Sequence, residues 1–242
     1  MKIKNLILIL SFIAVPYFMA VCQTDSSLIN KTDAQGQKQG EWVKYFKNGK
    51  IRYTGNFKDN NPVGEFKYYY GNGKLETISI FSDNGKTCKT EMFYPNGKLI
   101  AKGSYIGKNK DGLWLYFDIQ GNLISDEFYK DNQKNGTWKS YFRDKKINKQ
   151  IQWVDGKKNG EWLMFYTDGT PKLKASYKKD SIDGLFQFFY MSGKIKISGL
   201  YANNIKEGVW LYYDEIGKLE KKEIYLEGIL KGLVNYKDKE KE

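Results

Sequence analysis

The sequence predicts an all-β protein, an elongated antiparallel sheet of stacked 24-residue β-hairpin repeats that form a solenoid. A small residue returns every 24 residues, and in eight units an aromatic residue follows it five positions later and another seventeen positions later. A fixed period in the twenties is typical of an array in which each unit buries its face against its neighbours. These anchor residues are Gly40, Gly64, Cys88, Gly112, Gly136, Gly160, Gly184, Gly208 and Gly232.

Two residues in each unit predict where the hairpin turns. Positions eight and nine after the anchor hold Asn48-Gly49 in the first unit, and six later units have a similar pair ending in glycine. Asn-Gly between two alternating runs predicts a two-residue turn in which both residues take a positive φ. The fifth unit has Asp144-Lys145 instead. We therefore expect its turn to be strained or differently built.

The residues that face each other across such a hairpin fit in size. Positions are counted from the anchor, which is position zero. With a two-residue turn, the numbers of two facing positions add up to seventeen, so each anchor faces the aromatic residue of position seventeen and Trp42 faces Gly55. Position six, mostly Phe or Tyr, is expected to face an apolar residue at position eleven. Because side chains alternate between the faces of a strand, these positions share one face, which is expected to carry the core.

The opposite face is expected to be polar on the second strand of each hairpin and aromatic on the first. Its rings would form a ladder along a sheet of sixteen strands, about 75 Å long at the usual strand spacing. One interpretation is that the rings pack on one another, and the other is that they bind a partner. The candidate partner-binding residues are Tyr45, Tyr69, Phe93, Phe117, Tyr141, Phe165, Phe189 and Tyr213.

The third unit departs most from the frame. Cys88 takes the place of the anchor glycine and Thr90 that of the tryptophan. We expect Cys88 to be a small buried residue, and the loss of a large ring at Thr90 to loosen the sheet locally. The array is expected to span residues 36–237 as eight full repeats and a terminal fragment, followed by a charged tail at residues 238–242, a polar ending for the sheet edge.

The N-terminus predicts export. Residues 1–22 combine a charged start with an apolar run of the size found in signal peptides, and residues 23–35 would be a short linker. Cys22 is a lipidation candidate in one interpretation and is removed with the signal peptide in the other. The mature protein would then lie in the periplasm, in the outer envelope or outside the cell.

The composition argues against catalysis and against bound cofactors. The sequence contains no histidine, which removes Ser-His and Cys-His nucleophile pairs and most zinc sites. We therefore expect no enzyme activity, no catalytic residue, no metal site, no cofactor and no small-molecule substrate. The formal net charge is +12, Lys2 and Lys4 would leave with the signal peptide, and most of the remaining charge is spread along the array. Diffuse lysines keep an open sheet soluble, but they also attract anionic membrane surfaces.

The segment G-E-W-V-K-Y-F-K-N-G-K-I, from Gly40 to Ile51, resembles the bacterial MORN-variant repeat of the YwqK-type antitoxin family. The resemblance covers roughly residues 36–236, and implies a MORN-like solenoid that binds proteins and, for the namesake group, neutralises a toxin. The expected function is an exported, non-enzymatic protein-binding scaffold, with an antitoxin-like or immunity role toward a toxin or envelope protein. The alternatives are binding to an anionic membrane surface and a structural role in the envelope; nucleic acid is not an expected partner.

Overall fold

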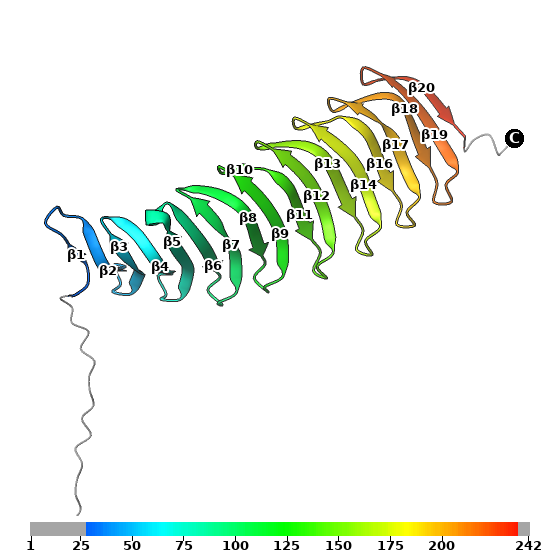
Figure 1. Ribbon diagram of the computed structural model, residues 1–242. Coiled ribbons are helices and arrows are strands. Elements are labelled where there is room, and N and C mark those ends of the chain that lie inside the picture. Colours follow the sequence, from blue (N-terminus) through cyan, green and yellow to red (C-terminus); the bar gives the residue numbers. More distant parts are fainter. Residues whose placement is uncertain (1–27, 237–242) are drawn as a thin grey trace, which may run out of the picture.

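The computed structural model describes residues 28–236, which form one open antiparallel sheet of 20 strands without an α-helix in that range. Strands that are close in sequence pair with each other, so the sheet is one layer thick and runs from the N-terminal to the C-terminal end of the array (Figure 1). This confirms the predicted fold class. The signal peptide, Cys22 and the charged tail lie outside the described residues.

The strands follow the 24-residue frame, and most units form one hairpin of two strands. β10 and β11 both pair with β9, and β15 and β16 both pair with β14, so each of these short pairs is one interrupted strand. The strands are β1 (Lys31–Thr32), β2 (Lys38–Tyr45), β3 (Ile51–Lys58), β4 (Asn61–Tyr69), β5 (Leu75–Ser82), β6 (Thr87–Phe93), β7 (Leu99–Ile106), β8 (Asn109–Phe117), β9 (Leu123–Lys130), β10 (Gln133–Lys134), β11 (Gly136–Tyr141), β12 (Ile147–Val154), β13 (Lys157–Phe165), β14 (Pro171–Lys178), β15 (Ser181–Ile182), β16 (Gly184–Phe189), β17 (Ile195–Ala202), β18 (Ile205–Tyr213), β19 (Leu219–Leu226) and β20 (Ile229–Asn235).

The hairpin register agrees with the prediction except next to the turn. Gly40 lies opposite Phe57, and Trp42 lies opposite Gly55. The register then shifts by one residue, so that position five, not position six, lies opposite position eleven, as in Tyr45 opposite Ile51. The expected pairing of position six with position eleven is therefore wrong, because a β-bulge adds one residue to the second strand.

The predicted turn type is also wrong. In the first hairpin, Phe46 N–H donates to Lys50 O and Gly49 N–H donates to Phe46 O, which leaves a three-residue loop. Gly49 has a φ of 79°, whereas Asn48 is not among the residues with positive φ. This pattern matches a three-residue hairpin loop with one left-handed residue at its end. The fifth unit makes the same two hydrogen bonds with Lys145 in that place, at a φ of 67°, so its turn is strained but not differently built.

The two-residue turns with two positive φ values connect one repeat to the next. Asp59 and Asn60, with φ of 50° and 64°, lie between the paired residues Lys58 and Asn61. Asn60 N–H donates to Lys38 O, and Lys38 N–H donates to Asn60 Oδ1. Asparagine suits this position because it tolerates a positive φ and its side chain accepts a hydrogen bond from the preceding turn.

In most repeats the anchor glycine is required by a second bulge, at the start of the first strand. Between β3 and β4 the register shifts by two residues, and Gly64 has a φ of 67° there. Gly112 and Gly208 have similar values, 74° and 65°. A side chain is disfavoured in this left-handed region, which explains why glycine returns at the anchor.

The third repeat has no such bulge. Cys88 is not among the residues with positive φ, and β5 and β6 pair without a shift from Thr77–Met92 to Ser82–Thr87. The two residues that the bulge takes up elsewhere lie instead in a longer connection that contains the short 3-10 helix η2 (Asp83–Gly85). Cys88 is 7% exposed, which confirms the prediction of a small buried residue.

In three repeats a buried ring of the core lies on a glycine of the preceding repeat. A Cβ atom added to Gly55 would lie 2.3 Å from the Phe66 ring, and one added to Gly103 would lie 2.3 Å from Trp114. Phe66, Trp114 and Trp210 are the largest fully buried side chains, and each covers a glycine at position fifteen. The register confirms the predicted pairing of Trp42 with Gly55 within one hairpin, and the added Cβ contact shows that Gly55 also receives a ring from the next repeat.

The two edges of the sheet differ. β1 lies within the expected linker and pairs with β2 through Lys31–Gln39 and Thr32–Lys38, so the first edge is covered in part. At the other edge, the last described strand, β20, exposes four apolar side chains: Ile229, Leu230, Leu233 and Val234.

Candidate functional site

The eight ladder aromatics are mostly covered. Tyr45 is 51% exposed, whereas Phe189 is 9% exposed and the other six are half-buried. The bulge at position twelve places these residues opposite position eleven, as in Tyr45 opposite Ile51 and Phe93 opposite Leu99. The described ring pairs include none of the eight, so the rings do not pack on one another in the expected way. Their role as a partner surface stays a prediction.

Two ladder residues contact the polar side chains beside them. Tyr141 Oη donates to Asp126 Oδ2 at 2.8 Å, and burial together with this bond raises the pKa of Tyr141 to about 12. Lys174 Nζ lies 5.8 Å from the centroid of the Phe189 ring. These contacts place both rings on the face opposite the core, hereafter the back face, as the sequence predicted.

The back face exposes aliphatic pairs that sequence reasoning missed. Positions one and sixteen lie opposite each other, and in the fourth, seventh and eighth repeats both are apolar: Leu113–Phe128, Leu185–Leu200 and Val209–Ile224. All six side chains are exposed, from 39% at Ile224 to 54% at Leu113. The sequence did contain a signal for these pairs, because the adjacent seventh and eighth repeats carry apolar residues at both positions. Leu185, Leu200, Val209 and Ile224 form the C-terminal apolar patch.

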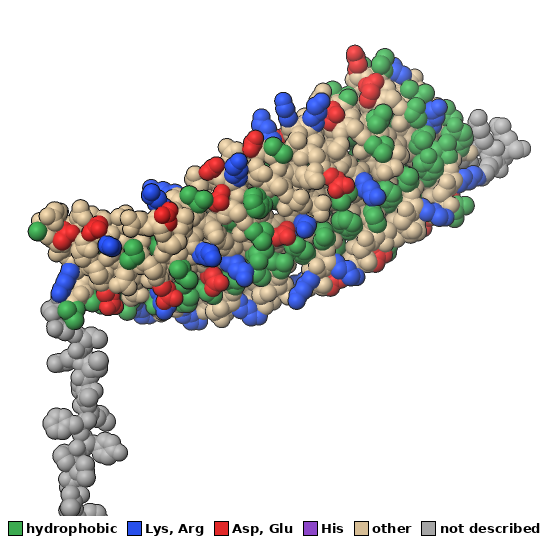
Figure 2. Space-filling model, in the orientation of Figure 1, with side chains coloured by type: hydrophobic (Ala, Val, Ile, Leu, Met, Phe, Trp, Pro, Cys, Tyr) green, Lys and Arg blue, Asp and Glu red, His purple; other side chains and the backbone are tan. Residues whose placement is uncertain are grey.

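Charges and apolar side chains are distributed differently along the molecule. Figure 2 shows Lys, Arg, Asp and Glu dispersed over the face in view, while hydrophobic side chains gather toward the C-terminal end.

Lysine also takes part in the core, another feature that the sequence reasoning missed. Two positions before the anchor, Lys134 Nζ lies 4.2 Å from the centroid of the Trp138 ring and 4.3 Å from that of Trp153. Lysines at the same place in other repeats lie over the corresponding rings: Lys38, Lys110, Lys158 and Lys206. These cation–π contacts give part of the positive charge a structural role.

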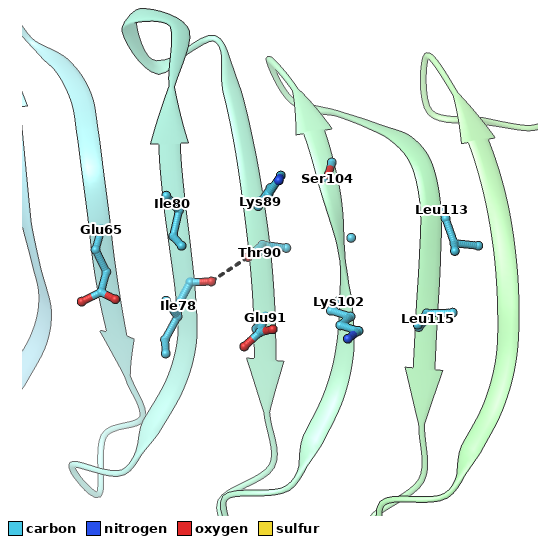
Figure 3. Close-up of a pocket in the computed structure, with 11 residues that line it drawn as sticks. Glu65, Ile78, Ile80, Lys89, Thr90, Glu91, Lys102, Ser104, Leu113 and Leu115 are labelled. Carbon is cyan, nitrogen blue, oxygen red and sulfur yellow. Dashed lines mark hydrogen bonds between the residues drawn. The ribbon is translucent and has the colours of Figure 1, made fainter.

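The third repeat is hollowed on both faces. Thr90 stands where the other full repeats carry a ring, and its hydroxyl group lies 2.9 Å from that of Ser79, at position fifteen of the preceding repeat, in a hydrogen bond. On the back face, a groove of about 490 Å³ crosses β4 to β8, and Figure 3 shows its labelled side chains. Ile78 and Ile80 form one side, Leu113 and Leu115 the other, and the charged Glu65, Lys89, Glu91 and Lys102 lie around and between them. A second hollow of about 410 Å³ lies on the core face.

The environment of Cys88 in the third repeat disfavours its thiolate form. Burial raises the pKa of the Cys88 thiol, although a hydrogen bond to Ser79 acts in the opposite direction. A raised pKa keeps the sulfur in its weakly nucleophilic thiol form. Within residues 28–236, no group of three or more Cys, Asp or Glu residues is placed to hold a metal ion.

Seven segments match the family described as MORN repeat variant, and together they cover more than half of the chain. They are residues 38–59, 62–83, 89–106, 134–155, 158–179, 182–203 and 206–227. The protein therefore belongs to the MORN repeat variant family. Residues 110–131, the fourth structural repeat, lie outside these matches even though they form the same hairpin.

Other comparisons add little. No curated protein matches the chain. Among solved structures, a mutant of Staphylococcus aureus TarM in complex with fondaparinux, alpha-GlcNAc-glycerol and UDP aligns at 14% identity and a TM-score of 0.30. That alignment covers 40% of this chain and 19% of TarM. The Photorhabdus luminescens Tc holotoxin pore, with a mutated TccC3, aligns at 13% identity and a TM-score of 0.23 over 81% of this chain and 13% of the other. This chain thus spans less than a fifth of either structure.

The described part of the chain contains no helix that is long and apolar enough to cross a membrane.

Proposed function

We propose that this protein is an exported, non-enzymatic repeat scaffold that binds another protein through the back face of its sheet. The observation that carries the proposal is the C-terminal apolar patch, whose four side chains are 39–52% exposed on two adjacent hairpins. Contiguous exposed apolar side chains on a sheet are typical of interaction surfaces. A rigid single-layer sheet can present such a surface without large rearrangement.

The finer role we propose is that of an immunity or antitoxin-like protein. Its partner would be a toxin or another protein of the cell envelope, and its site of action would lie outside the cytoplasm. The family and the apolar patch support protein binding, and the signal-like N-terminus supports export. Lipid attachment at Cys22 would anchor the protein to a membrane, whereas cleavage after Cys22 would release it.

Capture experiments test the binding surface. The tagged protein is incubated with envelope and secreted fractions of its host and washed at low and high salt. We expect a stoichiometric protein to survive the high-salt wash and to be lost from the double variant Leu185→Ser/Leu200→Ser. The ladder prediction is tested with Tyr141→Ala/Phe165→Ala, and exposed Lys130→Ser is the matched control. Undiminished capture by the Leu185/Leu200 variant would refute the patch as the interface.

A second candidate function is binding to an anionic membrane surface. It is favoured by exposed lysines on the back face of second strands, such as Lys102, Lys174 and Lys196, which are not used in the core. This function predicts binding to phosphatidylserine vesicles that weakens steeply with salt, because exposed charges are screened. Absent or salt-insensitive binding excludes it, and a structural envelope role then remains if no protein is captured either.

A further inference from the structure

The regular repeats show how the core face holds an aromatic ring. The Phe66 ring lies between Phe57 and Phe81, at centroid distances of 5.1 Å to each and interplanar angles of 90° and 77°. Trp114 meets Tyr105 in the same way, at 4.9 Å and 76°. Edge-to-face contacts of this kind are a preferred arrangement of aromatic pairs. Each ring is therefore held by aromatic residues at position seventeen.

The third repeat keeps these aromatic walls but has no ring of its own between them. Thr90 stands at the ring position and is 3% exposed, with its hydroxyl bonded to Ser79. The resulting hollow of about 410 Å³ is lined by apolar side chains and by several polar ones at its floor and rim. Tyr68, Phe81, Met92 and Tyr105 form the apolar part of this lining. Glu76 and Lys108 are among its polar residues.

The size and lining of the hollow suit an aromatic ring. An apolar cavity of about 150 Å³ is enough to bind benzene in a protein interior. Phe81 and Tyr105 supply rings for edge-to-face contacts, and Met92 supplies a thioether, which interacts favourably with aromatic rings. The hydroxyl groups of Ser79 and Thr90 already bond to each other, so the floor does not require a charged or strongly polar ligand.

We propose that this hollow binds a single aromatic side chain, a Trp, Tyr or Phe ring presented by the protein partner. The part of this inference that names the partner rests on the proposed function, whereas the ring site itself does not. The inserted ring would complete the stack of the core face at the one full repeat within residues 28–236 that has no ring at position two. A small probe of the same chemistry therefore binds the isolated protein.

The test is a titration of the full protein with N-acetyltryptophanamide, monitored by NMR of methionine methyl groups labelled with ¹³C. The Met92 methyl signal is expected to shift saturably, because an aromatic ring placed beside it changes its magnetic environment. Met164 and Met191 lie in other repeats and are expected to keep their signals. N-acetylleucinamide, an aliphatic probe of the same backbone, is expected to leave Met92 unchanged at equal concentration.

Three variants make the outcome decisive. Thr90→Trp fills the hollow and is expected to abolish the shift, whereas Thr90→Val keeps the space and the binding. Tyr105→Leu removes one aromatic wall and is expected to weaken binding at least fivefold, which keeps the test valid if Thr90→Trp does not fold. An unmoved Met92 signal, equal responses to both probes, or undiminished binding by Tyr105→Leu would overturn the proposal. Because no partner is used, this result is independent of the capture experiment.

Discussion

Replacing Gly103 with alanine would place a methyl group against the most buried ring of the core. The added Cβ would lie 2.3 Å from Trp114 Cδ2, and an ordinary contact begins at 3.4 Å, so the ring must move by 3.4 − 2.3 = 1.1 Å. Trp114 is 1% exposed, and its Nε1 donates to Ser104 O at 3.1 Å. Overpacking of this kind costs about 1–3 kcal/mol, and loss of the hydrogen bond adds about 1 kcal/mol. We therefore expect a local loss of about 2–4 kcal/mol.

Urea unfolding and hydrogen exchange measure this loss. Because each repeat contacts only its neighbours, protection is expected to fall first in β7 and β8. Gly71→Ala is the matched control, since its added Cβ would meet nothing within 4 Å and its φ is not positive. If Gly103→Ala and Gly71→Ala unfold alike, the ring-on-glycine packing does not hold the repeats together.

Three further substitutions test other features. Lys145→Gly relieves a φ of 67° in the fifth turn and is expected to stabilise the protein by about 0.5–1 kcal/mol, measured by urea unfolding. Lys110→Met removes cation–π contacts to three rings and should cost about 1–2 kcal/mol, whereas exposed Lys130→Met should change stability by less than about 0.5 kcal/mol. Burial disfavours charged Glu223, but hydrogen bonds led by that from Lys221 outweigh it and lower its pKa from 4.5 to about 2. The stabilisation from Glu223, on the order of 3 kcal/mol, is present above pH 4.5 and lost as the pH falls toward 2; Glu223→Gln should flatten this part of a melting-temperature profile.

The sequence was sufficient for the fold because its period and its alternation are both strict. A frame without insertions places Trp42 opposite Gly55, and a side-chain period of two assigns both to one face. The turns were harder to predict. Asn48-Gly49 is compatible with a two-residue turn and with a three-residue loop, since both end in a residue that tolerates a positive φ. With the three-residue loop that forms, position eleven lies opposite position five, whereas a two-residue turn would place it opposite position six.

That single residue explains why the candidate site was only partly predictable. Alternation correctly predicted the face on which Tyr141 and Phe189 lie, but it gave no information on what covers them. The bulge places position eleven opposite the ladder residues, and the exposed apolar pairs of the back face lie instead at positions one and sixteen of three repeats. Coverage depends on bulges in neighbouring strands, and bulges are not readable from hydrophobic periodicity alone.

The third repeat shows how one departure from the frame leads to others. A side chain at Cys88 disfavours the positive φ that the bulge needs, so the two extra residues move into the connection containing η2 and the 24-residue period is preserved. Without the bulge, β5 and β6 pair evenly, and Ser79 and Thr90 meet through a hydrogen bond where three other repeats place a ring on a glycine. The hollow is thus supported by the even backbone pairing of β5 with β6, and the hydroxyl groups beneath it are hydrogen-bonded to each other. It can remain open without exposing an unpaired hydroxyl group, as a site that receives a ring from outside requires.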